Sequence, residues 1–232
     1  MRTAPILVCL ALLLGSAMSA QTVTAPARPE ITEHYRTMLR YQRRMDGNVP
    51  DRAVVFIGDS LTQGLCTDAV ACPSVNYGIG SDTTMGVLGR LAEYGSLKRA
   101  SAVVLAVGVN DLLFRDNGAI VENHRRILAT LPPDLPVVCS ALLPIHEPIY
   151  GPSVVSNARI RELNSALKVL CSNEPRCVFA DAGPGLVDGE GNLKESLQDG
   201  DGIHLNAEGN AIWIGVLKTA VTTAQMRAKG RP

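Results

Sequence analysis

The sequence predicts a single three-layer α/β/α domain, with a parallel β-sheet covered by helices on both faces. Short apolar runs rich in Val alternate with longer stretches of helical periodicity along most of the 232 residues. Strands buried on both faces are apolar almost throughout, and strand–helix alternation is typical of a parallel sheet. With 46% hydrophobic residues and no internal repeat, residues 30–232 have the length and composition of one domain.

The first 29 residues are predicted to lie outside this domain. Arg2 precedes an apolar run over residues 6–14, and small residues fill positions 15–20. This order is typical of a secretory signal peptide, and the apolar run is too short to span a bilayer. A buried N-terminal helix is the alternative. We therefore expect a signal peptide over residues 1–20, a Pro-containing lead-in over 21–29, and a secreted or periplasmic protein.

The remaining elements follow in order. Ile31, Tyr35, Met38 and Met45 recur at helical spacing and predict an amphipathic first helix. Strands are then expected over residues 53–57, 74–77, 102–107, 136–142 and 177–180. Helices are expected near residues 83–98, 117–130 and 153–171, and a last helix after Asn206.

The cysteines fit an oxidising compartment. Cys66 and Cys72, and likewise Cys171 and Cys177, are close enough in sequence to close small disulfide loops. Cys139 lies in an apolar strand pattern and is expected to be a buried free thiol. A metal site is the weaker alternative, because no His lies at ligand spacing from either pair.

The balance of charges indicates which partners this protein is expected to bind. Lys and Arg number 22, Asp and Glu number 22, and no basic block occurs. Nucleic-acid binding depends on clustered Lys and Arg, so a nucleic-acid partner is not expected.

The first strand is followed by a candidate nucleophile. Residues 58–61 (Gly-Asp-Ser-Leu) place Ser60 at a strand-to-helix turn. A helix N-terminus favours a developing negative charge, so a Ser at this point is suited to nucleophilic attack. The alternative is that Ser60 is only an N-cap.

The last loop contains a candidate base. Asp201 lies three residues before His204 in a Gly-bearing turn, where a carboxylate can bond Nδ1–H and leave Nε2 free. Asn206 is expected to cap the closing helix. His34 and His124 lie in helical stretches and are poorer candidates, whereas His146 either lines the cleft or belongs to a plain loop.

Two more polar loops follow strands at the same sheet edge. Residues 76–84 form a Gly-bearing turn that is suited to presenting a backbone N–H before a helix. Residues 108–111 (Gly-Val-Asn-Asp) contain Asn110, whose amide is suited to donating into a cleft. Function gathers at the carboxyl ends of parallel strands, so these loops are expected to converge.

These four segments resemble the four sequence blocks of the SGNH (GDSL) esterase/lipase family, in the family's order. The second block is similar to that of platelet-activating-factor acetylhydrolase-like members. The resemblance implies a flavodoxin-like five-stranded sheet of order 2-1-3-4-5. It also implies Ser60 as nucleophile, His204 as base and Asp201 as the carboxylate that orients it.

The resemblance further implies an oxyanion hole made of the Ser60 N–H, a second-block N–H and the Asn110 side chain. The family has Gly directly before the Asp of the second block, whereas this sequence has Ser81 there. A backbone N–H is the required donor, so the role passes to Ser81 if its backbone can adopt the necessary conformation.

The predicted function is a secreted carboxylic ester hydrolase that works through an acyl-enzyme, with no metal or organic cofactor required. The substrate would be a small-molecule or glycan ester with a short acyl group, acetyl above all. The sequence contains no long apolar insertion that could build a lid, and stable membrane insertion is not expected. A lysophospholipase, thioesterase or acyltransferase remains an alternative, as does a non-catalytic binding protein. The sequence does not give the oligomeric state.

Overall fold

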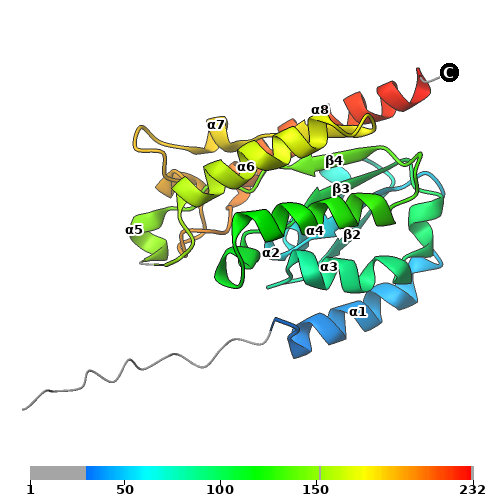
Figure 1. The fold of residues 1–232 in the computed structure, drawn as a ribbon, viewed down its shortest axis with the longest axis horizontal. Coiled ribbons are helices and arrows are strands. Elements are labelled where there is room, and N and C mark those ends of the chain that lie inside the picture. The colour runs from blue at the N-terminus through cyan, green and yellow to red at the C-terminus, as the bar shows by residue number, and fades with distance from the viewer. Residues whose placement is uncertain (1–29, 152, 231–232) are drawn as a thin grey trace, which may run out of the picture.

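The computed structural model describes residues 30–151 and 153–230, so the predicted signal peptide and lead-in lie outside the described residues. Five parallel strands form one sheet of order β2-β1-β3-β4-β5 (Figure 1). They are β1 (Val54–Gly58), β2 (Ser74–Gly78), β3 (Ala102–Ala106), β4 (Val137–Ser140) and β5 (Cys177–Ala180). The predicted three-layer fold and strand order are confirmed.

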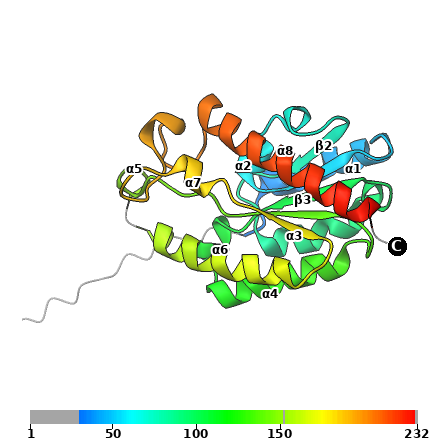
Figure 2. The same cartoon turned by 90° about the horizontal axis from the view of Figure 1, so that it is seen from above.

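Helices cover both faces of the sheet (Figure 2). The long ones are α1 (Glu33–Asp46), α3 (Thr84–Arg90), α4 (Asn117–Thr130), α6 (Asn157–Ser172) and α8 (Ala207–Lys229), and the short ones are α2 (Ser60–Gln63), α5 (Glu147–Tyr150) and α7 (Gly183–Leu186). Helices α3, α4 and α6 pack on one face, and α8 packs on the other. Within the described ranges, no helix has the length and apolar character to cross a membrane.

The two faces follow from the alternation of side chains along each strand. In β1, Val55 and Ile57 join the core under α3, α4 and α6, whereas Val54 and Phe56 join the core under α8. All four side chains are at most 2% exposed. Trp213 of α8 is buried in the second core, and its Nε1–H donates to the Ser140 hydroxyl at 3.1 Å.

Three predicted elements are shorter than expected. The helix expected over residues 83–98 ends as α3 at Arg90 and continues as two 3₁₀ turns. The helix expected from residue 153 begins at Asn157, because Ser156 caps it. The strand expected over 136–142 ends at Ser140, because the N–H and C=O of Leu142 bond the Asn164 side chain of α6 instead of a strand.

The predicted first helix is present as α1, but the amphipathic pattern predicted for it matches its buried face only at Tyr35. Ile31 and Met45 are 36% and 45% exposed, whereas Tyr35, Gln42 and Asp46 are buried. The reason is that the surface under α1 is polar as well as apolar. Asp46 accepts hydrogen bonds from the Tyr77 hydroxyl at 2.9 Å and from the Ser96 hydroxyl. Its buried carboxylate therefore has hydrogen-bond donors from the segments packed against α1.

One of the two predicted disulfides is present. Cys171 and Cys177 are bonded, which ties the end of α6 to the first residue of β5. Cys139 in β4 is a buried free thiol, as predicted, and burial raises its pKa to about 12.

The predicted Cys66–Cys72 bond is not formed, and both thiols are exposed. A 3₁₀ turn over Thr67–Ala69 folds this segment instead. The Ser74 hydroxyl then donates to Asp68 at 2.6 Å, so hydrogen bonds close the loop where a disulfide was expected.

Candidate active site

Ser60 begins α2 directly after the first strand. Asp59 is the N-cap of this helix, and its carboxylate accepts the Leu61 N–H at 3.0 Å. The alternative of Ser60 as a cap is therefore wrong, because the neighbouring carboxylate takes that role. The Ser60 Oγ instead lies 2.9 Å from Nε2 of His204.

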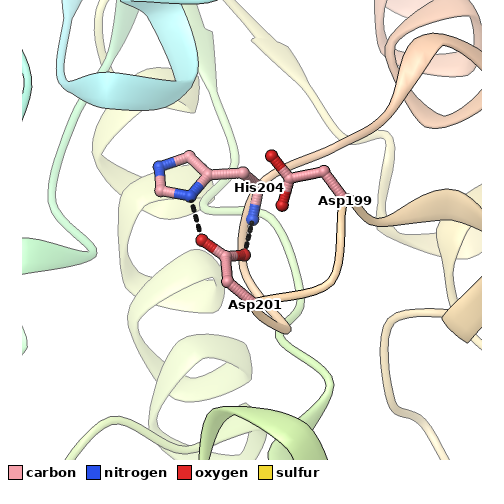
Figure 3. A group of neighbouring side chains, drawn as sticks. All are labelled: Asp199, Asp201 and His204. Carbon is pink, nitrogen blue, oxygen red and sulfur yellow. Dashed lines mark hydrogen bonds and ion pairs between the residues drawn. The ribbon is translucent and has the colours of Figure 1, made fainter.

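His204 is oriented by the loop that carries it (Figure 3). Its Nδ1 lies 2.5 Å from Asp201 Oδ2, and Asp201 Oδ1 accepts the N–H groups of Ile203 and His204, each at 2.9 Å. The carboxylate thus bonds the ring and the backbone of the same turn. Ser60, His204 and Asp201 form one continuous hydrogen-bonded chain.

Gly202 allows this turn to form. Its φ is +81°, and a Cβ there would lie 2.7 Å from the Tyr150 backbone nitrogen. The Gly202 carbonyl accepts the His146 N–H at 2.7 Å, which fixes the loop to the start of α5. Glycine is required at this point by both conformation and space.

The electrostatics of Asp201 suit an orienting carboxylate. Its partial burial raises the pKa, but hydrogen bonds from the backbone and ring of His204 and from the Ile203 N–H outweigh that effect. The net result lowers the pKa of Asp201 to about 2. The carboxylate is therefore charged across the neutral range and accepts the Nδ1–H of a neutral imidazole.

The Ser81 backbone has the conformation that the resemblance required of a glycine. Its φ is +64°, in the left-handed region. The preceding Gly80 N–H donates to Gln63 Oε1, so that group is already used. Among residues 30–151 and 153–230, the N–H groups of Ser60 and Ser81 have no hydrogen-bond acceptor.

Asn110 lies next to this turn, at the start of a 3₁₀ helix after β3. One N–H of its side-chain amide donates to the Asp82 carbonyl at 3.0 Å. Its second N–H has no partner in the part of the chain that the structure describes. At the edge of the sheet that carries Ser60, backbone and side-chain donors from three loops thus have no acceptor among the described residues.

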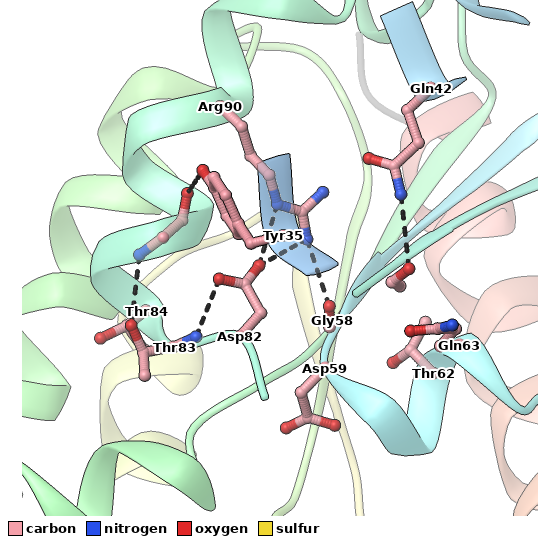
Figure 4. A network of polar contacts seen from close by, with 12 residues as sticks. Tyr35, Gln42, Gly58, Asp59, Thr62, Gln63, Asp82, Thr83, Thr84 and Arg90 are labelled. Carbon is pink, nitrogen blue, oxygen red and sulfur yellow. Dashed lines mark hydrogen bonds and ion pairs between the residues drawn. The ribbon is translucent and has the colours of Figure 1, made fainter. Parts of the chain in front are cut away.

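A buried polar layer supports these loops (Figure 4). Arg90 and Asp82 form a fully buried ion pair at 2.9 Å. Sequence reasoning missed Arg90, although a signal was present: it shares a helical face with the apolar Val87 and Tyr94. A charge on an apolar stripe indicates a buried, partnered group.

Asp111 is a second buried acid that the sequence did not single out. It accepts the Thr84 N–H at 2.8 Å, and Thr84 Oγ1 bonds both Asp111 and Asn123. Arg115 also pairs with Asp111. These contacts join the start of α3 to the loop that contains Asn110.

Burial changes the titration of two acids beneath the site. It raises the pKa of Asp59 to about 7, against the lowering effect of the Leu61 N–H. It also raises the pKa of Asp82 to about 6, although the Arg90 guanidinium lowers it. Both carboxyls are therefore much harder to ionise than exposed ones.

The other histidines have structural surroundings. His124 is buried, its Nε2 lies 3.2 Å from the Val107 carbonyl, and burial lowers its pKa to about 4. His34 bonds Gln63 at 3.1 Å. His146 caps α5 through Nδ1, which accepts the Ile149 N–H at 3.3 Å, so its role in the structure is that of a loop residue.

One group of side chains has the spacing of a metal site. Asp199, Asp201 and His204 present ligand atoms within 4.8 Å of one another. Asp201 and His204 already bond each other through those atoms. The donor set therefore fits an oriented imidazole better than a cation, which would have to displace that hydrogen bond.

Comparison with known proteins identifies the family of the chain. Residues 56–212 match the model of the GDSL-like lipase/acylhydrolase family, and the chain therefore belongs to that family of hydrolases. The family that the sequence motifs predicted is confirmed.

Individual relatives share only a limited part of their sequence with this chain. The chain is 31% identical over 158 residues to platelet-activating factor acetylhydrolase IB subunit alpha1 of Rattus norvegicus, a match that covers 64% of this chain and 66% of the relative. In fold it is similar to a GDSL-like lipase from Bacteroides thetaiotaomicron, with a TM-score of 0.68, 21% identity and coverage of 80% and 98% of the two chains. An acetylxylan esterase from Geobacillus stearothermophilus has a TM-score of 0.60 at 15% identity, covering 73% and 94%.

Proposed function

We propose that this protein is an exported serine esterase that removes short acyl groups, acetyl above all, from a carbohydrate or a small lipid ester. The observation that carries the proposal is the hydrogen-bonded chain from Ser60 Oγ through His204 to Asp201, at 2.9 and 2.5 Å. A hydroxyl, an imidazole and a carboxylate in this order are the parts of an activated serine nucleophile.

In this mechanism Ser60 Oγ attacks the ester carbonyl and gives its proton to Nε2 of His204. Asp201 accepts the Nδ1–H and stabilises the imidazolium. The N–H groups of Ser60 and Ser81 and the amide of Asn110 would stabilise the oxyanion. The imidazolium then protonates the leaving alcohol. Water attacks the acyl-enzyme in the second half, with His204 again taking the proton.

Two observations support a short acyl group. The cavity beneath the nucleophile loop, lined by Asp59, Leu61 and Trp213 among others, has a volume of only about 10 Å³. That is the size of one water molecule and gives no room for an acyl chain to enter the interior. The rat relative and the Geobacillus neighbour are both named for acetyl esters.

Export rests on the sequence of residues 1–20, which lie outside the described residues, and on the Cys171–Cys177 disulfide. Structural disulfides form in oxidising compartments. N-terminal sequencing of the mature protein from the medium or periplasm should begin near residue 20. A mature chain that retains Met1 would contradict export.

Hydrolysis of p-nitrophenyl acetate by the purified protein tests the activity. Ser60→Ala removes the nucleophile and should abolish turnover above the rate in buffer. Ser172→Ala is the matched control, because its exposed hydroxyl only bonds the Val169 carbonyl of its own helix. Equal rates for the wild type and Ser60→Ala would contradict the proposal and favour a non-catalytic binding protein.

A series of p-nitrophenyl esters of increasing chain length tests the acyl preference. We expect kcat/KM to be highest for acetate and to fall for longer chains, because the small cavity beneath the nucleophile loop has no room for them. A maximum at long chains would favour the lysophospholipase alternative. Faster transfer of the acyl group to an added alcohol than to water would favour a transferase. Faster hydrolysis of a thioester than of the corresponding oxygen ester would favour a thioesterase. Acetylated xylan and an acetylated glycerolipid then separate the two substrate classes.

A further inference from the structure

Arg90 is a fully buried cation, and each of its three side-chain nitrogens contacts a protein acceptor. It ends α3 and has a relative exposure of 0%. Its Nε and Nη2 both lie 2.9 Å from Asp82 Oδ2. Nη2 also donates to the Gly58 carbonyl at 3.2 Å, and Nη1 donates to the Tyr94 hydroxyl at 2.7 Å.

Two of these acceptors, Gly58 and Asp82, lie close in sequence to candidate oxyanion donors. Gly58 ends β1 two residues before Ser60. Asp82 directly follows Ser81, and its carbonyl accepts the Asn110 amide at 3.0 Å. The guanidinium is thus one hydrogen bond from the nucleophile loop, and Asp82 is in contact with both other loops.

We infer that Arg90 and Asp82 are positioning residues, which hold the N–H of Ser60, the N–H of Ser81 and the amide of Asn110 in one fixed arrangement. This inference rests on the proposed function. It adds that the three loops of the oxyanion site are joined through Arg90 and Asp82.

Stability alone is a poor explanation for the ion pair. Taking two charges out of water is costly, and buried ion pairs can often be replaced by apolar residues of similar volume without loss of stability. A planar guanidinium, however, can bond a carboxylate and a carbonyl at fixed angles at the same time. An apolar residue cannot orient two loops in this way.

The space around Asp82 is also restricted. A Cβ on Gly86 would lie 1.9 Å from Asp82 Oδ1 and 3.1 Å from Tyr35 Cε2. Only a glycine at position 86 leaves the carboxylate in contact with Arg90. A Cβ on Gly89 of the same helix would lie 3.7 Å from the Tyr35 hydroxyl, which is an ordinary van der Waals contact. The two glycines therefore offer a matched pair of substitutions.

The first test compares Arg90→Lys with Tyr94→Phe. Lysine keeps the charge but cannot bond Asp82 and Gly58 with the same geometry. Tyr94→Phe removes the guanidinium contact to a hydroxyl that bonds Gln42 of α1, outside the three loops. The assay is p-nitrophenyl acetate hydrolysis, with kcat expressed per site labelled to completion by a fluorophosphonate, so that unfolded protein is not counted.

For Arg90→Lys we expect kcat to fall roughly 10- to 100-fold with KM changed less than about threefold, because the donors act in the transition state. For Tyr94→Phe we expect kcat per labelled site to equal that of the wild type, even if the melting temperature falls. A merely structural role for Arg90 would lower the melting temperature and leave kcat per labelled site unchanged.

The second test compares Gly86→Ala with Gly89→Ala and is informative if Arg90→Lys does not fold. Gly86→Ala should displace Asp82 and lower kcat per labelled site by a similar factor, whereas Gly89→Ala should leave it unchanged. Wild-type kcat in both Arg90→Lys and Gly86→Ala would overturn the positioning role alone. A wild-type protein that neither takes the label nor hydrolyses the ester would overturn the proposed function itself.

Discussion

The two sides of the candidate site are built differently. On one side, Asp201 and His204 belong to a single short loop, and the carboxylate bonds the ring and the backbone within three residues. On the other side, Ser60, Ser81 and Asn110 come from three loops. The guanidinium of buried Arg90 bonds the Gly58 carbonyl and the Asp82 carboxylate, and the Asp82 backbone carbonyl bonds Asn110. The first arrangement is local and partly exposed, whereas the second is distant in sequence and buried.

The two sides also have opposite electrostatics. Hydrogen bonds that the Asp201 carboxylate accepts from Ile203 and His204 lower its pKa to about 2, despite its partial burial. Burial raises the pKa of Asp59 to about 7 and that of Asp82 to about 6. The environment therefore favours the charged form of Asp201, which orients the imidazole. Burial instead opposes the ionisation of Asp59 and Asp82 beneath the three loops.

The largest effect is expected on the local side. Asp201→Asn replaces the acceptor of the Nδ1–H by an amide that favours the wrong tautomer, so kcat should fall on the order of 10⁴-fold. Asp199→Asn is the same change two residues away, on a side chain that makes no hydrogen bond to other described residues. It should leave kcat within about twofold in the same p-nitrophenyl acetate assay. Equal losses in the two variants would show that charge in the loop matters, not orientation of the ring.

The next effect concerns the distant side. Asn110→Ala removes one candidate donor without changing the backbone, and kcat should fall on the order of 10²–10³-fold with little change in KM. Asn173→Ala, on the exposed end of α6, is the control and should have no kinetic effect. Steady-state kinetics measure both. An increase in KM alone would place Asn110 in substrate binding instead.

A smaller effect is expected on stability. Asp59 is 1% exposed, and its pKa is raised from 3.8 to about 7 in the folded protein. The folded state therefore binds the proton more tightly, so the contribution of Asp59 to stability is complete below pH 3.8 and is lost as the pH rises through 7. Relative to Asp59→Asn, the wild type should lose on the order of a few kcal/mol over this range.

Urea unfolding of both proteins at several pH values between 4 and 8 measures this difference. Asparagine keeps an oxygen that can accept the Leu61 N–H, so the cap at the start of α2 is preserved. A wild-type-minus-variant difference that does not change with pH would mean that Asp59 ionises as easily as an exposed carboxyl.

The contrast also explains what the sequence could predict. Strand–helix alternation gave the sheet and its helices because apolar runs report burial directly, and the helix over residues 117–130 was predicted to the residue. The Asp201–His204 pair was predictable because its contacts lie within three residues. The face of α1 was mispredicted because its buried surface meets polar groups from distant segments, such as Tyr77 and Ser96.

The sequence motifs could not predict the contacts of Arg90 for the same reason. Arg90 and Gly58 are 32 residues apart, and only the folded sheet brings them into contact. The absence of a Cys66–Cys72 bond was likewise unpredictable from spacing, since a 3₁₀ turn folds that loop instead. The spacing of two cysteines in the sequence shows that a disulfide between them is possible. The hydrogen bonds that fold the loop in another way depend on the surrounding structure.

The smallest effect is expected at Ser81, on the side of the site that is built from three loops. Its φ of +64° is unfavourable for any residue with a Cβ, by roughly 1 kcal/mol, and glycine adopts it without that cost. Ser81→Gly should therefore keep kcat within about twofold and stabilise the protein by up to about 1 kcal/mol, less the added freedom of the unfolded chain. Ser81→Ala keeps the Cβ and removes only the hydroxyl, so its stability and its kcat should both match the wild type. Thermal unfolding and ester hydrolysis of the two variants measure these outcomes. If both lose activity, the Ser81 hydroxyl acts in the reaction; if only Ser81→Gly does, the strained backbone is itself needed to aim the N–H.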